Sequence, residues 1–511
     1  MQSPPTRLGQ PVLAWAQITP DAPALSEPGR NWSFAQLAGA VDEAASLLRE
    51  RGVRRGDRVM VIGENSLALA AFIFAAGQLD TTAVLENARR APLEVDTIRA
   101  HCEPRCVVYT VDVSPDALAH AQRHGAESRD LGSIGHIAVG TTMTDAVPDP
   151  VSDSADDVAV LIYTTGTTGA PKGVMLTHAN LLYLAQMMRK LRRLTAGDRV
   201  YGVLPITHVM GLAGVFCGTL SAGAHLHLAA RFSAAQCLQQ LAEQRSTMLQ
   251  GAPAMFAKLA DQGRRHPVGP LSLRFIAAGG APIDATVKAD TEAFFGLTLH
   301  NGYGLTEGSG LSWTRLDQPR SDCSVGLPLP GVEFKLLEPG GTAPAEGPIG
   351  ELWARGPNVM KGYYRNPELT TQLLQNGGWF NTQDLARIDA DGYLHIEGRT
   401  KDLIIVSGFN VYPLEIEQVL NAHPGVLQSA VVGRPSAGSE DVIAFVEPAA
   451  GHDLELAALQ AFLAERLSPY KRPREIWLMS SLPTAPNGKL LKNQLKALTQ
   501  FGIGDAATRL S

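Results

Sequence analysis

The chain has 511 residues, of which 45% are hydrophobic and 18% are charged, and this composition is typical of a folded globular protein. Its 44 basic and 50 acidic residues leave a formal net charge of −6, which argues against nucleic acid or an anionic membrane as the principal partner. The longest weakly polar run, residues 209–224, is shorter than the roughly 20 apolar residues of a spanning helix. Because residues 1–10 also lack the apolar core of a signal peptide, we expect a cytoplasmic protein without integral membrane association.

The first part of the chain alternates helical periods with short β-rich runs. Such alternation is typical of right-handed βαβ units and a parallel sheet. The helical periods cover residues 34–48 and 67–79, and the β-rich runs cover residues 58–62, 82–85 and 107–110.

A second doubly wound α/β unit is expected after a polar stretch. Residues 141–157 contain two prolines and five aspartates, which predicts a surface connection. A strand is expected at 158–163. The pattern then continues with a helix at 177–191 and strands at 200–204, 224–228, 247–250 and 273–278.

After residue 324 the sequence pattern changes to short strands separated by Gly and Pro turns, which predicts a small β-rich subdomain. From about residue 401 the pattern is that of a compact α+β unit. The fold class is therefore α/β, with two doubly wound subdomains and a β-rich subdomain before a small α+β domain. The late strands are expected at 331–337, 349–354, 393–397, 426–433, 442–446 and 475–479, and the late helices at 413–421 and 454–467.

Residues 163–173, Tyr-Thr-Thr-Gly-Thr-Thr-Gly-Ala-Pro-Lys-Gly, follow a predicted strand and precede a predicted helix. Small residues let backbone N–H groups turn toward an anion, threonine hydroxyls add donors, and Lys172 supplies a point charge. A Walker A loop needs Gly before this lysine and Ser or Thr after it, whereas this chain has Pro171 and Gly173. We therefore predict a triphosphate-binding loop of a different kind from that of P-loop kinases.

A second segment, residues 301–307, reads Asn-Gly-Tyr-Gly-Leu-Thr-Glu. Tyr303 offers an aromatic face to a nucleobase, Thr306 offers a hydroxyl to a phosphate, and Glu307 offers a hard oxygen to Mg²⁺. Taken alone, this segment fits a turn at the end of a strand equally well.

Together, the two segments resemble the adenylate-forming superfamily, which contains acyl-CoA synthetases, luciferases and the adenylation domains of peptide synthetases. The resemblance covers nearly the whole chain, from about residue 32 to Lys489. The other matching motifs, in family order, are Gly-Gly-Ala-Pro at 279–282, Trp-Phe-Asn-Thr-Gln-Asp at 379–384, Gly-Arg-Thr-Lys-Asp-Leu-Ile at 398–404, Ser-Gly-Phe-Asn-Val-Tyr-Pro at 407–413 and Pro-Thr-Ala-Pro-Asn-Gly-Lys at 483–489.

The resemblance implies how the nucleotide would be held. Adenine would lie between Tyr303 and the backbone near Gly280 and Ala281. Asp384 would accept hydrogen bonds from both ribose hydroxyls, and Arg399 would contact ribose or phosphate. The β- and γ-phosphates would be wrapped by Thr164, Thr165, Gly166, Thr167, Thr168, Gly169 and Lys172.

The resemblance also implies the catalytic groups. Glu307, with Thr165, would hold Mg²⁺, and Thr306 would contact phosphate. Lys489 matches the mobile C-terminal lysine that enters the site during adenylation, and His208 matches a histidine near the substrate carboxylate.

Family members rotate the C-terminal domain between two half-reactions, about a hinge that corresponds to Lys401. This implies a large domain of residues 1–400 and a small mobile domain of residues 401–511. After rotation, Gly408 would line the tunnel for the pantetheine arm of coenzyme A.

The implied activity is an ATP-dependent acyl-CoA synthetase that forms an acyl-adenylate and then a thioester, releasing AMP and pyrophosphate. The acyl pocket would come from residues 208–214, 277–280 and 302–309, which are small or apolar, with no basic residue near 277–280 to hold a second carboxylate. This favours a fatty or aromatic monocarboxylic acid. The alternatives are a ligase that loads the phosphopantetheine of a carrier protein and a non-catalytic acyl- or nucleotide-binding sensor. A homodimer is common among relatives.

The chain departs from the family pattern at Gln383, where members usually have Gly before the ribose-binding aspartate. Asp384 is intact, so we expect nucleotide binding to survive. If residue 383 requires a positive φ, which only glycine enters cheaply, the local backbone is expected to shift.

Overall fold

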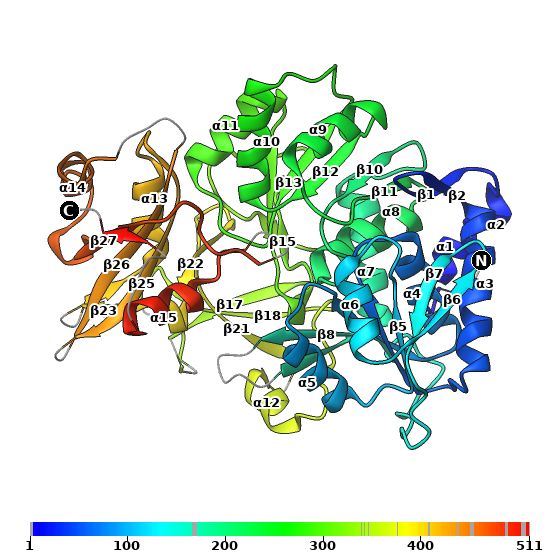
Figure 1. The fold of residues 1–511 in the computed structure, drawn as a ribbon. Coiled ribbons are helices and arrows are strands. Elements are labelled where there is room, and N and C mark those ends of the chain that lie inside the picture. Colours follow the sequence, from blue (N-terminus) through cyan, green and yellow to red (C-terminus); the bar gives the residue numbers. More distant parts are fainter. Residues whose placement is uncertain are drawn as a thin grey trace.

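Two large sheets, a smaller antiparallel sheet and a C-terminal unit make up the molecule (Figure 1). Among the described residues, no helix is both long and apolar enough to cross a membrane. The computed structural model describes residues 4–165, 171–338, 340–341, 343–345, 347–375, 377–406, 409–436, 439–449, 454–485, 489–501 and 507–509.

The first sheet has eight strands in the order β19-β9-β8-β4-β3-β5-β7-β6. Its central strands β8, β4, β3 and β5 are parallel, as the alternating pattern predicted, while the outer strands pair antiparallel. The strands are β3 (Arg58–Gly63), β4 (Thr82–Asn87), β5 (Cys106–Tyr109), β6 (Glu127–Leu131), β7 (Gly135–Val139), β8 (Val158–Thr165), β9 (Pro171–Thr177) and β19 (Gly362–Tyr363).

The second sheet has nine strands in the order β16-β15-β14-β13-β12-β10-β11-β1-β2, and the run from β14 to β1 is parallel. The strands are β1 (Pro23–Glu27), β2 (Arg30–Ser33), β10 (Arg199–Gly202), β11 (His225–Leu228), β12 (Met248–Gly251), β13 (Phe275–Ala278), β14 (Leu299–Tyr303), β15 (Ser312–Trp313) and β16 (Leu327–Pro328).

Helix α4 (Leu67–Gln78) lies between the two large sheets and contacts strands β3 and β4 of the first sheet and β1 of the second. Its residues are apolar on every side, and all but Gln78 are buried. A helix that is apolar all round is stable only when it is covered all round. At its start, the hydroxyl of Ser66 accepts a hydrogen bond from the backbone N–H of Leu69 over 3.1 Å.

The other helices of the large sheets connect or cover their strands (Figure 1). One of them is a π-helix, η1 (Met210–Cys217), which follows β10. The others are α1 (Gln10–Leu13), α2 (Trp15–Ile18), α3 (Phe34–Glu50), α5 (Pro92–Cys102), α6 (Pro115–Arg123), α7 (His178–Leu191), α8 (Gly218–Ser221), α9 (Ala234–Glu243), α10 (Pro253–Arg265), α11 (Ala285–Phe295) and the short 3₁₀-helix η2 (Thr306–Gly308).

Residues 141–157, predicted as a surface connection, have no helix or strand but are tied to the first sheet by arginines. Arg58 is fully buried and pairs with Asp149 over 2.8 Å. Arg7 likewise pairs with Asp157 over 3.0 Å. This connection is therefore anchored to the domain along its length, which sequence polarity alone did not indicate.

The predicted β-rich subdomain is a five-stranded antiparallel sheet in the order β17-β18-β21-β20, with β22 paired to β21. In Figure 1 it lies between the large sheets and the C-terminal unit. Its elements are β17 (Glu333–Leu337), β18 (Gly350–Arg355), β20 (Leu374–Gln375), β21 (Trp379–Ile388), β22 (Leu394–Arg399) and helix α12 (Pro367–Leu373).

The C-terminal unit is α+β, as predicted, and helix α13 (Pro413–Asn421) has the expected bounds. Its four-stranded sheet has the order β25-β26-β27-β28 and lies beside a separate hairpin, β23-β24. The remaining elements are η3 (Thr400–Asp402), β23 (Ile404–Val406), β24 (Phe409–Val411), β25 (Val426–Ser436), β26 (Ser439–Pro448), α14 (Leu456–Ala464), η4 (Pro469–Lys471), β27 (Glu475–Leu478), α15 (Lys492–Phe501) and β28 (Thr508–Arg509).

Candidate active site

The predicted phosphate-binding segment begins in strand β8 and ends in strand β9. Strands β8 and β9 pair antiparallel, with Thr164 opposite Lys172. The helix expected at 177–191 is confirmed as α7, but a strand that the sequence did not predict, β9, comes before it. Lys172 therefore lies within a strand and not at the N-terminus of a helix. Gly166, Thr167, Thr168 and Gly169 and the side chain of Thr165 lie outside the described residues.

Tyr163 fixes the base of this pair of strands. Its hydroxyl lies 2.7 Å from Nδ1 of His101. A Cβ atom on Gly173 would lie 2.9 Å from the Tyr163 ring, so the glycine allows the two strands to pack across this ring. The glycine that excludes a Walker A motif therefore has a packing role.

Tyr303, Asp384 and Arg399, which we call the Asp384 cluster, meet where β14 ends beside β21 and β22. The Tyr303 hydroxyl donates to Oδ2 of Asp384 over 2.5 Å, and Nε of Arg399 lies 3.3 Å from Oδ1. Asp384 is only 4% exposed. Burial raises its pKa above the ordinary value, although the positive charge of Arg399 and the Tyr303 hydroxyl oppose that rise.

Gln383 has a φ of 59°, so the position does require the left-handed conformation that glycine enters cheaply. The backbone adopts it with glutamine in place. The N–H of Gln383 donates to Oδ1 of Asn381 over 2.8 Å, and the N–H of Asp384 donates to the Thr382 hydroxyl over 3.1 Å. These two bonds hold the turn, and Asp384 keeps its place in the cluster.

Lys489 comes from the C-terminal unit, and the segment before α15 extends toward the centre of the molecule (Figure 1). Lys489 is close enough to Asp384 and Arg399 to interact with their charges. It also interacts with the charge of Lys401. Burial, followed by the charge of Arg399, lowers the pKa of Lys489 to about 8. Burial and Arg399 also lower the pKa of Lys401, and Lys172 adds to the effect. We call Lys172, Lys401 and Lys489 the lysine cluster.

This crowding of cations provides a test of whether a nucleotide fits. Nearby positive charge disfavours the charged forms of Lys401 and Lys489, and a polyphosphate anion would offset that penalty. The carboxylate of Asp384, which is predicted to bind the ribose hydroxyls, lies close enough to Lys401 and Lys489 to interact with their charges. The residues present therefore suit the polyphosphate and ribose of ATP.

His208 precedes the π-helix η1, and its Nδ1 accepts a hydrogen bond from the backbone N–H of Met210 over 3.4 Å. Burial lowers the pKa of His208 to about 4, and the positive charge of Lys489 acts in the same direction. The imidazole is therefore neutral near pH 7 and is suited to hydrogen bonding. Its interaction with Lys489 links the predicted carboxylate-binding residue to the C-terminal unit.

Glu307 is held in η2 by Tyr363, whose hydroxyl donates to Oε1 over 2.8 Å. The second carboxylate oxygen has no hydrogen bond or ion pair within the described part of the chain. A carboxylate oxygen left open in this way is a ligand that Mg²⁺ accepts, so Glu307 fits the predicted role. The neighbouring Thr306 is 7% exposed.

Gly279 and Gly280 follow β13, beside Met210 of the π-helix. A Cβ on Gly279 would lie 3.0 Å from Cε of Met210, and Gly280 has a φ of 78°. Both positions therefore favour glycine, one for space and one for conformation. Ala281 follows them, and Gly408 lies outside the described residues.

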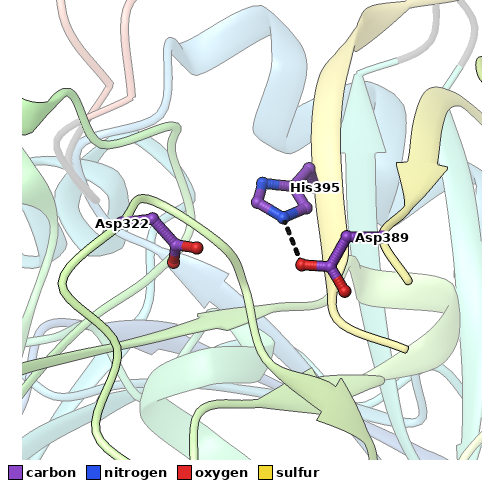
Figure 2. A group of neighbouring side chains, drawn as sticks. All are labelled: Asp322, Asp389 and His395. Atoms are coloured by element: carbon purple, nitrogen blue, oxygen red, sulfur yellow. Dashed lines mark hydrogen bonds and ion pairs between the residues drawn. The ribbon is translucent and has the colours of Figure 1, made fainter. Parts of the chain in front are cut away.

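A group of three further side chains, Asp322, Asp389 and His395, brings potential metal-binding atoms within 4.8 Å of one another (Figure 2). Nε2 of His395 lies 3.2 Å from Oδ2 of Asp389. The guanidinium of Arg320 pairs with Asp322 and lies 3.5 Å from Asp389. Because this arginine already neutralises the carboxylates, we interpret the group as an ion-pair network that supports the turn before β22.

The sequence motifs did not include two groups that the fold brings to the site. Tyr363, which positions Glu307, lies 56 residues further along the chain, so only tertiary pairing reveals it. Arg192, at the end of α7, has its guanidinium 4.9 Å from the rings of Phe275 and Trp313. Arg192 thus lies near β13 although it is distant in the sequence, whereas Arg274, which directly precedes the strand, pairs with Asp198 over 2.7 Å.

Comparison with known families identifies the class. The AMP-binding enzyme family matches residues 12–364, and the C-terminal domain of AMP-binding enzymes matches residues 415–489. The chain therefore belongs to the AMP-binding, adenylate-forming enzyme family, as the motifs indicated.

Relatives with known names are CoA ligases. A feruloyl-CoA synthase from Amycolatopsis sp. is 34% identical, with 96% of this chain and 98% of the relative covered. An indoleacetate–CoA ligase from Aromatoleum aromaticum is 32% identical, with 94% and 96% covered. This chain is accordingly an enzyme of the CoA ligase class.

Solved structures agree over the same length. ATP-bound MatB from Rhodopseudomonas palustris has a TM-score of 0.83 at 31% identity, with 96% of this chain and 99% of that chain covered. The o-succinylbenzoate coenzyme A synthetase MenE from Bacillus subtilis, in complex with ATP and magnesium ion, has a TM-score of 0.80 at 28% identity, with 95% and 99% covered. Both the fold class and the two-domain arrangement are thus confirmed.

Proposed function

We propose that this protein activates an aromatic monocarboxylic acid with ATP and transfers the acyl group to coenzyme A, releasing AMP and pyrophosphate. The relatives that act on ferulate and indoleacetate support an aryl acid over a fatty acid. Their names also favour free coenzyme A over a carrier protein as acceptor. The observation that carries the proposal is the meeting of Lys489 with His208, Asp384 and Arg399.

In the first half-reaction, the substrate carboxylate attacks the α-phosphate of ATP in line. Catalysis of phosphoryl and adenylyl transfer depends mainly on positioning and on neutralising developing charge. We assign the charge neutralisation to Lys489 and Lys172, and we assign ribose binding to Asp384. Glu307 and Thr165 would hold Mg²⁺, which would supply Lewis-acid neutralisation of the phosphates.

The substrate carboxylate is proposed to lie beside His208. Because burial keeps this imidazole neutral, with a pKa of about 4, it orients the carboxylate by a hydrogen bond without trapping it in an ion pair. Gly279 and Gly302 allow Met210 and Trp313 to pack closely against the ends of β13 and β14. The acyl group is proposed to lie beside these side chains, with Tyr303 facing the adenine.

For the second half-reaction, we propose that residues 401–511 rotate about Lys401 as a body. Lys401 lies in the short helix η3 between β22 and the C-terminal hairpin, where a change of φ and ψ would move everything after it. Rotation would withdraw Lys489 and bring Gly408 toward the adenylate, making room for the thiol of coenzyme A.

The proposal is tested by incubating purified protein with ATP and Mg²⁺ and a panel of aromatic, fatty and dicarboxylic acids, with and without coenzyme A. Products are identified by mass spectrometry. We expect AMP and an aryl-CoA thioester. An adenylate without a thioester would move the acceptor to a carrier protein, and no adenylate from any acid would favour the sensor alternative.

A further inference from the structure

Gln250, at the end of β12, has a buried side-chain amide without a strong hydrogen-bond partner. It is 8% exposed, and its Nε2 donates only to the sulfur of Met188, over 3.8 Å. Its Oε1 accepts no hydrogen bond from the described residues. Thioether sulfur is a weak acceptor, and a buried amide without a proper partner is unfavourable. Such a group indicates a ligand that completes its hydrogen bonds.

The strand register places Gln250 on the acyl side of the predicted site. Gln250 is aligned with Ala277 of β13, and Ala277 with His300 of β14, so the three side chains share one face of the sheet. Gly279 lies two residues after Ala277, next to Met210. Gly302 lies two residues after His300, next to Trp313. Two strand residues span about 6.6 Å, so Gln250 lies one layer deeper than the glycines.

A third glycine keeps the amide open. A Cβ on Gly214, in the π-helix, would lie 3.8 Å from Oε1 of Gln250, so any larger side chain there would cover this oxygen. Gly214 thus leaves Oε1 of Gln250 uncovered on the side of the π-helix, and His208 lies just before the same helix, which begins at Met210. A flat acyl group whose carboxylate lies at His208 would extend toward the amide.

We infer that Gln250 recognises a neutral hydrogen-bonding group, such as a phenolic hydroxyl or a ring N–H, at the far end of an aromatic acid. This inference rests on the proposed function. A side-chain amide can both donate and accept, and it carries no charge, so it suits a neutral substituent better than a second carboxylate.

Arg192 is the alternative anchor for a charged substituent. It is 3% exposed and its guanidinium is stacked between Phe275 and Trp313, with Nη1 donating to the backbone oxygen of Thr314 over 2.8 Å. Phe275 precedes Ala277 by two residues on β13, so Arg192 lies a layer beyond Gln250. Arg192 therefore lies further from the glycines at the ends of β13 and β14 than the Gln250 amide does.

The test compares 4-hydroxycinnamic acid with cinnamic acid in the wild type and in Gln250→Leu, which keeps the size of the side chain and removes the amide. We expect kcat/KM of the wild type to favour the hydroxylated acid by about 10- to 100-fold, because a site built to bind a hydroxyl is left unpaired by the analogue that lacks it. Gln250→Leu should lose most of this preference, chiefly through KM, and keep its rate with cinnamic acid.

Two further variants separate recognition from folding. Gln239→Leu, on the exposed side of α9, makes the same change away from the site and should keep the preference. Gly214→Ala, which leaves Gln250 in place but puts a methyl group against Oε1, should reduce it.

Several results would overturn the inference. A wild type that does not distinguish the two acids, or an equal loss for both acids in Gln250→Leu, would mean that the amide only supports the fold. A preference for a dicarboxylic acid that disappears in Arg192→Met but not in Gln250→Leu would assign recognition to Arg192. Absence of adenylate and thioester with every acid would instead reject the proposed function itself, and the inference with it.

Discussion

The Asp384 cluster and the lysine cluster lie side by side but are built differently. In the first, each polar group already has a partner, with the Tyr303 hydroxyl 2.5 Å and Arg399 3.3 Å from the Asp384 carboxylate. In the second, burial and nearby cations lower the pKa values of Lys401 and Lys489. With the proposed roles of these residues, the difference indicates that the nucleoside end of the site would be organised before binding, while the phosphate end would be completed by the anionic substrate.

The hinge proposal gives the largest expected effect. Lys401→Pro should leave adenylation within about twofold and block thioester formation, because proline locks φ at the residue that must turn. Pyrophosphate exchange measures the first step, and acyl-CoA formation measures the second. Lys401→Ala removes the same charge but leaves φ free, so it should retain thioester formation. Equal loss of both steps in Lys401→Pro would contradict a hinge at this residue.

Within the lysine cluster, we expect substitution of Lys489 to have the largest effect on the rate of adenylation. Lys489→Ala should slow adenylation about a hundredfold or more, since loss of one preorganised charged group costs on the order of 3 kcal/mol of transition-state stabilisation. The rate of pyrophosphate exchange at saturating ATP is the measurement. Lys258→Ala, an exposed lysine on α10, serves as the control. Unchanged exchange in Lys489→Ala would remove this lysine from the mechanism.

The Asp384 cluster should act on affinity. In Asp384→Asn we expect KM for ATP to rise about 10- to 100-fold, because hydrogen bonds to a charged group contribute about 1.5–3 kcal/mol. The asparagine also leaves Arg399 without its carboxylate. The exposed Asp391→Asn, in the turn before β22, is the matched control. If kcat fell while KM stayed constant, the two clusters would not divide binding and chemistry as proposed.

The pH dependence separates the two clusters without mutation. The pKa of Lys489 is about 8, so raising the pH through this value removes its charge in the free enzyme. We expect kcat/KM for pyrophosphate exchange to fall above pH 8, by about tenfold one unit higher, since this ratio reports the free enzyme. Lys489→Arg keeps a charge at these pH values and should flatten the profile. A wild-type profile that is level to pH 9.5 would argue against a charged Lys489 in the reaction.

The smallest effect concerns stability at Gln383. Replacing Gln383 with Gly should stabilise the fold by about 0.5–1 kcal/mol, because glycine adopts the positive φ at less cost, and KM for ATP should not change. Gln372→Gly, on the exposed side of α12, should have the opposite sign, because glycine lowers helix stability by about 1 kcal/mol. Denaturant unfolding measures both changes. Destabilisation by Gln383→Gly would mean that the side chain itself supports the turn.

Much of the fold was predictable because hydrophobic periodicity is local. The strands at β3, β4 and β8 and helices α7 and α13 lie where the pattern indicated, within a residue or two. The strand β9 was missed because its sequence, Pro-Lys-Gly-Val-Met-Leu-Thr, begins with residues that are rare in strands. It becomes a strand because β8 provides a partner along its whole length.

The residues of the candidate site likewise fall into those that sequence motifs predicted and those that only the fold reveals. The motifs included Asp384, Glu307, His208 and Lys489, and the fold brings Lys489 close to Asp384 and His208 from the far end of the chain. The sequence did not predict a role for three further residues, Tyr363, Gln250 and Arg192. Their roles depend on the side chains that they contact, and these contacts follow from the register of the sheets rather than from sequence spacing.

The burial of α4 has a consequence for how the molecule comes apart. The helix belongs to one continuous apolar core with residues of both large sheets, whereas the C-terminal unit has cores of its own. Neither large sheet can be exposed to solvent without uncovering this helix, so the two melt as a single cooperative body. The C-terminal unit has separate apolar clusters, so the rotation proposed for it would leave the core of the two large sheets intact.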